Sequence, residues 1–171
     1  MADAAYQAAL RMLARRDHFR AELADKLLRR GFTPPEVEAA LGRCAALGLV
    51  DDEGLARRFA EVRGTENGWG SRRIEAELRR RGVDRSTAEE ASRLDRVRLR
   101  AALATALRRA ELRASAGWWR LPARRARMVS SLLARGFEAD DAIAAVRELA
   151  ASRESQDDAL DDESGDPFGV P

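Results

Sequence analysis

The sequence predicts an all-α protein made of three tandem repeats, each of three helices. Apolar residues recur at helical spacing along most of the chain, and no segment shows the alternation typical of a β-strand. The second observation is internal similarity, because Gly31, Gly82 and Gly136 are nearly evenly spaced and each directly follows an arginine. Large apolar residues precede each glycine by eight and by four positions (Leu23, Ile74 and Met128; Leu27, Leu78 and Leu132). Roughly nine helices are therefore expected, with each glycine as a helix stop.

The first repeat is expected over residues 1–50. Two groups of apolar residues at helical spacing mark its first two helices (Tyr6, Leu10 and Leu13; Phe19, Leu23 and Leu27). Thr33 precedes Glu36 by three positions, the pattern of a capping box, so a third helix should begin there. Cys44, the only cysteine, lies on the apolar face of that helix, which indicates a buried and unreactive thiol.

The second repeat is expected over residues 51–94, with helices at about 52–63, 71–81 and 85–93. Asp51 and Asp52 stand at the start of the first, where a carboxylate accepts bonds from first-turn amides and suits the helix dipole. The same pair could instead be metal ligands or catalytic acids. No histidine and no further acid except Glu53 is close in sequence, so structural capping is the favoured interpretation. The buried face of this helix would hold Leu55, Phe59 and Val62.

The third repeat is expected over residues 95–151, and 152–171 as a disordered acidic tail. The repeat would contain helices at about 95–113, 122–135 and 139–151. In the tail the helical spacing of apolar residues stops, and seven acidic residues accompany a single arginine. The formal net charge of +2 therefore hides a strongly basic body joined to an acidic end.

The sequence offers little equipment for catalysis. His18 is the only histidine, so neither a histidine-based triad nor a metal site with two histidine ligands can form. No phosphate-loop motif is present, and the glycine-rich segment 64–70 follows a predicted helix rather than a strand. We therefore expect neither an enzyme nor a bound cofactor or metal. The start of the chain lacks a signal-peptide pattern and no run approaches about 18 apolar residues, so a cytoplasmic protein with no membrane contact is expected.

The distribution of arginine is the main functional signal. Residues 96–137 contain eleven arginines and one acidic residue, Glu111, so few of these charges can be paired within a helix. Several lie near a predicted helix start, where each cation opposes the dipole by about 0.3–1 kcal/mol. We interpret the cluster as a surface for an anionic partner or DNA, with the candidates Arg113, Trp118, Arg120, Arg124, Arg125 and Arg127. At least one of the rings of Trp118 and Trp119 is expected in the core, and the other could stack on a base or fill a partner's pocket.

The middle helix of the second repeat supplies two further candidates for contact with a partner or DNA. Its glutamates, Glu75 and Glu77, can neutralise most of its arginines at i, i+4 spacing. Arg72 and Arg80 lie eight positions apart on one row of this helix and are less well neutralised. They are therefore the better contact candidates on this helix.

Residues of the second repeat form a distinctive pattern, and a run of the first repeat fits it as well (Leu49-Val50-Asp51-Asp52, Ala56, Phe59 and Arg63; Gly68-Trp69-Gly70, Arg73-Ile74, Glu77-Leu78 and Arg81-Gly82-Val83; Glu22-Leu23, Lys26-Leu27 and Arg30-Gly31). In these residues the chain resembles the RecX family, bacterial regulatory proteins of RecA. It covers about residues 5–150 and implies tandem three-helix units in an elongated, curved molecule. The acidic tail departs from the family's usual form. We expect a monomer.

The resemblance also implies a function in homologous recombination and DNA repair. It implies binding in the helical groove of the RecA–DNA filament, with inhibition of strand exchange and of the RecA ATPase. RecA is the expected partner, and single- or double-stranded DNA is a further one. The alternative is a sequence-independent DNA-binding helical protein, and a helical scaffold comes third. A pure DNA binder should hold bare DNA with a steep salt dependence, whereas a filament regulator should act at concentrations too low to coat the DNA.

Overall fold

The structure is a computed structural model that describes residues 2–163 of the chain. Within this range it holds nine α-helices and no strand, which confirms the predicted all-α fold. The helices are α1 (Ala2–Leu13), α2 (Arg20–Leu28), α3 (Pro34–Ala46), α4 (Asp52–Thr65), α5 (Ser71–Arg80), α6 (Arg85–Ser92), α7 (Arg96–Glu111), α8 (Pro122–Leu133) and α9 (Ala139–Glu163). A short 3₁₀ turn, η1 (Trp118–Arg120), lies between α7 and α8. No helix in the described range is both long and apolar enough to cross a lipid bilayer.

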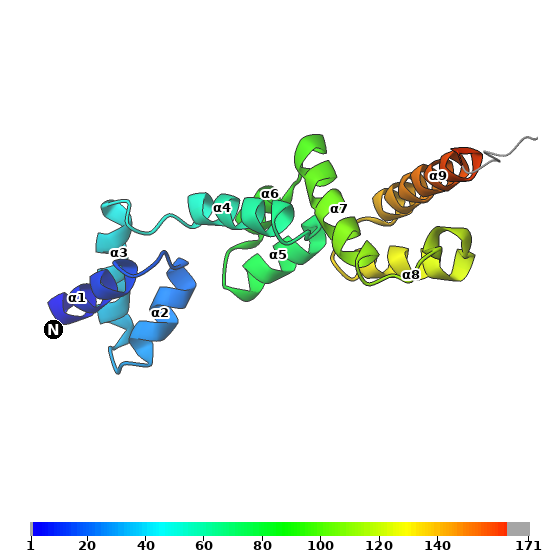
Figure 1. Cartoon of the computed structure of the whole chain (residues 1–171). Coiled ribbons are helices and arrows are strands. Elements are labelled where there is room, and N and C mark those ends of the chain that lie inside the picture. The colour runs from blue at the N-terminus through cyan, green and yellow to red at the C-terminus, as the bar shows by residue number, and fades with distance from the viewer. Residues whose placement is uncertain (1, 164–171) are drawn as a thin grey trace, which may run out of the picture.

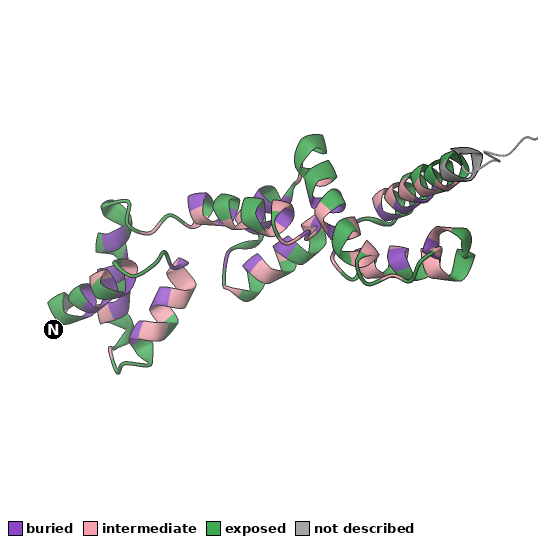
Figure 2. Ribbon diagram, viewed as in Figure 1, coloured by how far each residue is buried: buried purple, intermediate pink, exposed green. Residues whose placement is uncertain are grey.

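The helices form three consecutive groups along an extended molecule (Figure 1). One apolar cluster lies among α1, α2 and α3, a second among α4, α5 and α6, and a third among α7, α8 and α9. Figure 2 shows buried residues in each of the three groups. The chain exposes 11068 Å² of surface, whereas a compact monomer of 18.9 kDa would expose about 8,300 Å². The three-helix groups therefore follow one another as tandem repeats with separate small cores, as the sequence predicts.

The three glycines of the repeat pattern stop α2, α5 and α8. Gly31, Gly82 and Gly136 have φ angles of +88°, +83° and +86°, a region that residues with a side chain rarely adopt. In each repeat the next residue donates its N–H to the carbonyl of a leucine in the last helical turn (Phe32 to Leu27, 3.4 Å; Val83 to Leu78, 3.1 Å; Phe137 to Leu132, 3.3 Å). This is the bond of a Schellman stop, and it confirms the predicted role of the glycines.

The first repeat is joined to the second by polar and apolar contacts at the start of α2. Phe19 precedes α2, yet its ring is 1% exposed and packs in the apolar cluster of α4, α5 and α6. No side chain of its own repeat caps α2; instead the carboxylate of Asp52 accepts a hydrogen bond from the N–H of Arg20 at 2.8 Å. A Cβ on Gly82 would lie 2.3 Å from the Cβ of Ala21, so α5 ends directly against α2.

The second repeat is joined to the third at the corresponding place. The start of α5 also lacks a side-chain cap from its own repeat. Two carbonyls at the end of α8 accept bonds there: that of Arg135 from the N–H of Gly70 at 2.8 Å, and that of Gly136 from the N–H of Arg72 at 3.2 Å. A Cβ on Gly136 would lie 2.3 Å from the backbone nitrogen of Arg73. At both joints the middle helix of one repeat therefore begins against the end of the next repeat's middle helix.

The buried face of α4 differs from the predicted one. Val62 is 45% exposed, and Leu55 and Phe59 are only half-buried. The fully buried positions are small residues (Gly54, Ala56, Ala60 and Gly64). Small side chains allow the backbone of α4 to approach α6 and α7 closely, whereas the ring of Phe59 lies edge-on against Trp69 with 6.4 Å between ring centroids. Helical spacing of large residues alone therefore misidentified the packed face.

Helix α9 extends well beyond its predicted end at residue 151. The segment 152–163 is helical where the sequence predicts a disordered tail, and residues 164–171 lie outside the described residues. Ion pairs to the preceding elements accompany the extension: Arg153 donates to both carboxylate oxygens of Glu111 at 2.7 and 3.0 Å, and Asp157 accepts from Arg120 at 3.0 Å. These partners lie far away in the sequence, which explains why local composition did not predict the helix.

Candidate functional site

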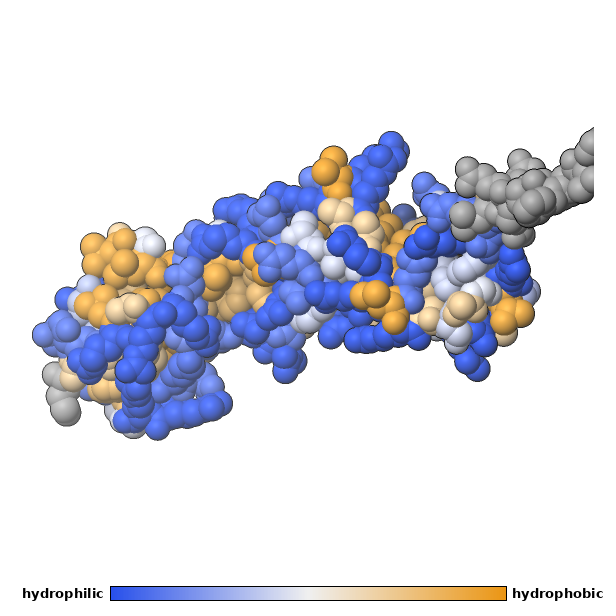
Figure 3. All heavy atoms as spheres, viewed as in Figure 1, coloured by the Kyte–Doolittle hydropathy of each residue, from blue (hydrophilic) through white to orange (hydrophobic). Residues whose placement is uncertain are grey.

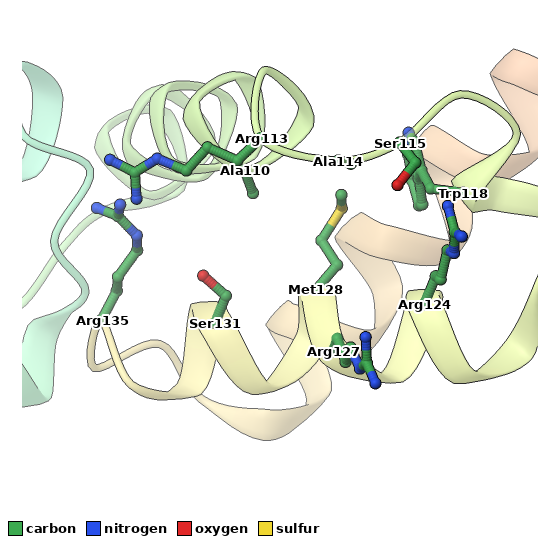
Figure 4. A pocket seen from close by; sticks show the side chains of 10 residues that line it. All are labelled: Ala110, Arg113, Ala114, Ser115, Trp118, Arg124, Arg127, Met128, Ser131 and Arg135. Carbon is green, nitrogen blue, oxygen red and sulfur yellow. The ribbon is translucent and has the colours of Figure 1, made fainter.

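A slot of about 280 Å³ lies between α7 and α8 and is lined by arginines (Figure 4). It is defined by Ala110, Arg113, Ala114, Ser115, Trp118, Arg124, Arg127, Met128, Ser131 and Arg135, and we call it the arginine slot. Arg113 lies two residues beyond the end of α7 and Arg135 two residues beyond the end of α8, and their guanidinium groups face each other at one end of the slot. Arg124 lies at the opposite end beside Trp118, and the side chain of Met128 rises between the two ends.

The positive charge of the slot is not compensated within the described part of the chain. No carboxylate among the described side chains of residues 3–159 lies within 4.0 Å of the guanidinium groups of Arg113, Arg124 or Arg127. Among the described residues, the guanidinium group of Arg135 donates to a single acceptor, the backbone carbonyl of Asn67, at 3.3 Å. Burial lowers the pKa of Arg135, and the neighbouring charges of Arg109, Arg113 and Arg73 lower it further. The slot therefore gathers like charges that an anion would stabilise.

Trp118 belongs to the core rather than to the open surface. Its side chain is 3% exposed and packs with Met128 and Leu132 in the third apolar cluster. Its ring meets that of Trp119 edge-on, with 6.1 Å between centroids and 89° between planes. Trp119 is half-buried, and its indole nitrogen is buried without an acceptor among the described residues. Trp118 thus forms a wall of the slot and offers no ring face on which a base could stack.

Two other predicted residues of the third repeat lie beside α9 and outside the slot. Arg120 donates to Asp157 at 3.0 Å, and Arg125 lies 3.9 Å from Glu154. All four side chains retain substantial exposure, so these pairs are weak and salt-sensitive. The acidic part of α9 therefore partly neutralises the arginine surface that the sequence predicts.

The prediction that Arg72 and Arg80 are less well neutralised than the other arginines of α5 is wrong. Arg72 donates two hydrogen bonds to Glu138, at 2.6 and 2.5 Å, and Arg80 donates two to Glu77, at 3.0 and 2.6 Å. Glu138 lies in the third repeat, so a search restricted to i, i+4 pairs within α5 could not find it. Arg72 thus reinforces the joint between the second and third repeats.

Both predicted capping residues make capping bonds, but to different helices. Asp51 accepts from the N–H of Gly54 at 2.9 Å and caps α4 as expected. Asp52 instead serves α2 through Arg20, across the joint between repeats. Burial raises the pKa of Asp52, while the bond and charge of Arg20 act in the opposite direction. In the described residues no group of three histidine, cysteine or acidic side chains could hold a metal ion.

Arg135 is the slot residue that sequence reasoning missed as a candidate. It belongs to the run of eleven arginines in residues 96–137 and directly precedes the third repeat glycine, but neither feature singled it out. A signal was available, because Arg124, Arg127 and Ser131 follow one another at three- and four-residue steps and so share one face of α8, and Arg135 continues this spacing just beyond the end of the helix. Arg113 follows the end of α7 and meets these residues only through the tertiary fold (Figure 4).

The outer surface is strongly polar, as expected for a thin molecule with 35% charged residues. Figure 3 shows hydrophilic residues over much of the visible face, with orange patches most evident on the first repeat. The arginine slot combines a concave shape with unpaired positive charge, and a second pocket with a largely cationic lining lies on the first repeat, where Arg15, Lys26 and Arg30 have no carboxylate partner among the described residues.

Comparison with known proteins gives consistent matches. Residues 5–44 match the family model described as "RecX, first three-helix domain", and residues 51–91 match "RecX, second three-helix domain". A "Regulatory protein RecX" of Halorhodospira halophila is 41% identical over 170 residues, covering 98% of this chain and 95% of that protein. One of Thermus thermophilus is 41% identical over 139 residues, covering 81% of this chain and 87% of that protein.

Other similarities are shorter or concern the fold alone. A "Regulatory protein RecX" of Mycobacterium sp. (strain KMS) is 48% identical, but over 75 residues that cover 44% of this chain and 41% of that protein. The crystal structure of RecX from Lactobacillus salivarius aligns with a TM-score of 0.71 at 22% identity, over 86% of this chain and 96% of that one. The helical repeats, the two matched domains and the nearly full-length match together place this chain in the RecX family.

Proposed function

We propose that this chain is a regulator of homologous recombination and DNA repair that binds the RecA–DNA filament and inhibits the recombinase and ATPase activities of RecA. The observation that carries the proposal is the uncompensated arginine slot on an extended member of the RecX family. A filament of protein and DNA presents a long surface with many negative charges. An extended molecule with unpaired cations suits such a surface better than it suits a small substrate.

The proposed action is binding rather than catalysis. The three small cores and their joints make a thin body that can contact several subunits of a filament at once. Contacts spread along such a body raise the overall affinity even when each is weak. In this proposal the chain works in the cytoplasm as a monomer, with RecA as its main partner and DNA as a second.

Sequence-independent DNA binding is a second candidate function, and the arginine slot also favours it. A guanidinium group binds phosphate oxygens through paired N–H donors, without reading a base. The two functions differ in their dependence on RecA. A pure DNA binder would affect RecA only by covering the DNA, and its effect would require enough protein to saturate the strand.

The experiment that tests the proposal is a titration of RecA ATPase on single-stranded DNA with this chain. We expect strong inhibition at ratios well below one chain per RecA, because a bound regulator acts on the filament and not on free DNA. Inhibition that appears only when the chain is sufficient to coat the DNA would favour the second function. No inhibition at any ratio would contradict the proposal.

A charge-reversal variant tests whether the arginine surface takes part. Arg124→Glu, Arg125→Glu and Arg127→Glu together should weaken inhibition while leaving the helical content intact. A matched control reverses Arg85, Arg96 and Arg100, which are exposed and have no carboxylate partner within the described residues. Equal inhibition by the two folded triple variants would exclude this surface as the RecA contact.

A further inference from the structure

We propose that a cationic pocket on the first repeat is a docking site for the acidic end of a second copy of this chain, so that copies associate head to tail. The pocket has a volume of about 550 Å³ and lies where the segment that follows α1 meets the C-terminal end of α2. We call it the first-repeat pocket, and its polar lining consists of Arg15, Arg16, His18, Lys26, Arg29 and Arg30. The inference goes beyond the proposed function, because the contact needs neither RecA nor DNA.

Most of the charge in the first-repeat pocket is not compensated within the described part of the chain. Arg15, Lys26 and Arg30 have no carboxylate within 4.0 Å among the described side chains. Two carboxylates lie near the other cations of the lining (Asp25, 2.6 Å from Arg29; Glu22, 3.7 Å from Arg16). The pocket therefore keeps three free cations around a concave surface, which an anionic side chain would stabilise.

One wall of the pocket is a buried imidazole without a hydrogen bond. His18 is 5% exposed, and its Nδ1 lies 3.5 Å from the Oε2 of Glu22, yet neither atom has a hydrogen-bond partner among the described residues. Burial lowers the pKa of His18, and the charges of Arg16 and Lys26 lower it further, while Glu22 acts in the opposite direction. The local field is thus that of cations lacking a counterion.

The segment with the complementary charge is the acidic end of the chain. Residues 152–171 contain seven acidic residues and one arginine, a net charge of −6. Four of these acids fall within six positions, where like charges repel one another (Asp158, Asp161, Asp162 and Glu163). Asp158 lies in the described part of the chain and has no cationic partner within 4.0 Å there. Contact with a cationic pocket would relieve this repulsion.

The two complementary parts lie too far apart to meet within one chain. Figure 1 shows α1 and α2 at one end of the extended molecule and the last turns of α9 at the other, with the second repeat and α7 between them. They can meet only between copies, and the contact then joins different surfaces of the two copies. Such a pair keeps a free pocket at one end and a free acidic segment at the other, so further copies can add in the same direction.

The contact is expected to be weak in dilute solution. It consists of a few exposed charges, and pairs of this kind contribute little and are screened by salt. The free chain therefore stays monomeric at low concentration, in agreement with the proposed monomer. A surface that holds several copies side by side would raise their effective concentration and so favour the contact.

The only lysine of the chain makes the pocket directly testable. Lys26 lines the pocket, and a carbodiimide joins a lysine amine to a neighbouring carboxylate as an amide, with the released water taken up by the reagent. An equal mixture of isotopically light and heavy full-length chain is crosslinked at rising concentration and low salt. We expect a dimer in which Lys26 of one isotope is joined to a carboxylate of residues 157–166 of the other. Mass spectrometry identifies the joined peptides and separates them from products of the α-amino group.

A pocket variant tests the cationic side of the contact. Arg15→Gln with Arg30→Gln removes two free charges, both at exposed positions, and keeps Lys26 as the reactive group. We expect about fivefold less dimer, the effect of losing two exposed ion pairs. The matched control is Arg85→Gln with Arg100→Gln, which removes the same charge from exposed positions without a carboxylate partner among the described residues. Equal losses in the two double variants would overturn the inference.

A tail variant tests the acidic side. Asp158→Asn, Asp161→Asn and Asp162→Asn together keep several reactive carboxylates between residues 157 and 166, so a crosslink stays chemically possible. We expect at least the same loss of dimer as in the pocket variant. The matched control neutralises three exposed acids that have no cationic partner among the described residues (Glu61→Gln, Glu90→Gln and Glu148→Gln). A control that loses as much dimer would assign the effect to net charge and overturn the acidic end as the occupant.

A mixture of the two variants distinguishes a head-to-tail contact from general attraction between opposite charges. The pocket variant still has an intact acidic end, and the tail variant still has an intact pocket. Mixed together, they should form more dimer than either forms alone, joined at Lys26 of the tail variant, and should stop at the dimer. The wild type should continue to larger species. A mixture that forms no more dimer than its components would overturn the head-to-tail arrangement.

Three further results would overturn the inference. The first is the absence of a dimer joined at Lys26 at any concentration. The second is a dimer in which Lys26 is joined to carboxylates outside residues 157–166, because the pocket would then hold another part of the chain. The third is a yield of dimer that does not fall at high salt. Circular dichroism and thermal melting confirm that each variant keeps its fold, which is expected because the altered arginines are exposed.

Discussion

Neighbouring residues of the same type serve different helices in this protein, and the sequence cannot distinguish them. Asp51 and Asp52 both stand at the start of α4, and either one satisfies the pattern of a helix cap. The fold decides their roles, because the side chain of Asp52 reaches the N–H of Arg20 in the preceding repeat. The sequence is enough to predict that an aspartate caps a helix here. The hydrogen-bond partner of Asp52 could not be predicted, because it depends on how the first two repeats are arranged.

A third capping aspartate gives a prediction about acid stability. Asp84 caps α6, accepting from the hydroxyl of Ser86 at 2.6 Å and from the N–H of Thr87 at 3.0 Å. These bonds hold the pKa of Asp84 well below the ordinary value of 3.8. Its ionised form is therefore favoured in the folded state, so its contribution to stability is complete above the unfolded value and lost as the pH falls through the folded one.

We expect Asp84→Asn to be less stable than the wild type at pH 7 and to differ from it less at pH 3. Urea unfolding at the two pH values measures both differences. Glu66→Gln serves as a control, because its carboxylate makes no hydrogen bond within the described residues. A difference between wild type and Asp84→Asn that grows on acidification would contradict the assignment.

At the scale of elements, helix α9 joins a packed apolar half to an acidic half that its local sequence predicts to be disordered. Its first part carries the expected apolar face, with Ala142, Val146 and Ala150 buried in the third cluster. Its second part has an acidic composition that favours disorder, yet it is helical to Glu163 and pairs with residues 37 to 42 positions away. Composition describes a segment in isolation, and it cannot include the countercharge that a distant arginine supplies.

The acidic part of α9 should restrain binding by the arginine surface. We expect Glu154→Gln with Asp157→Asn to bind a fluorescein-labelled oligothymidylate of twenty nucleotides about two- to fivefold more tightly, because an exposed ion pair is worth about 0.2–1 kcal/mol. These substitutions release Arg125 and Arg120 for a phosphate. The measurement is the fluorescence anisotropy of the labelled strand as the full chain is added, in the absence of RecA.

Glu148→Gln with Asp158→Asn is the matched control for the α9 variant. These acids lie on the same helix and have no cationic partner within 4.0 Å among the described residues. Removing them changes the net charge by the same amount. If the control gains as much affinity as the test variant, general electrostatics accounts for the effect and the pairs have no specific role.

At the scale of the whole molecule, the repeats could be predicted but their joints could not. The glycine stops and the apolar spacing are local signals, and both indicated three units. The joints depend on contacts between units: Phe19 lies in its neighbour's core, and the N-terminus of α5 bonds to the carbonyls of Arg135 and Gly136. The arginine slot needed the same information, because Arg113 and Arg135 meet only when α7 packs beside α8.

Substitutions at Gly31 and Gly82 distinguish the stability that a helix stop contributes from the stability that a joint between repeats contributes. Gly31→Ala should destabilise the protein by about 1–2 kcal/mol, the cost of a positive φ in a residue with a side chain. Gly82→Ala should cost clearly more, because its Cβ would also collide with Ala21 across the joint, whereas the Cβ at Gly31 would meet nothing within 4 Å. Thermal or urea unfolding compares the two directly. Equal losses would show that the joint is loose enough to open at little cost.

The two joints give the molecule a direction. Each is asymmetric: one side offers the free N–H groups at the start of a middle helix, and the other side offers acceptors and a glycine with no side chain to obstruct it. A unit turned end for end would bring two donor ends or two acceptor ends together, so successive units all point the same way. A polar partner with its own directional subunits would therefore accept this protein in one orientation only, and neighbouring copies on it would run parallel rather than opposed.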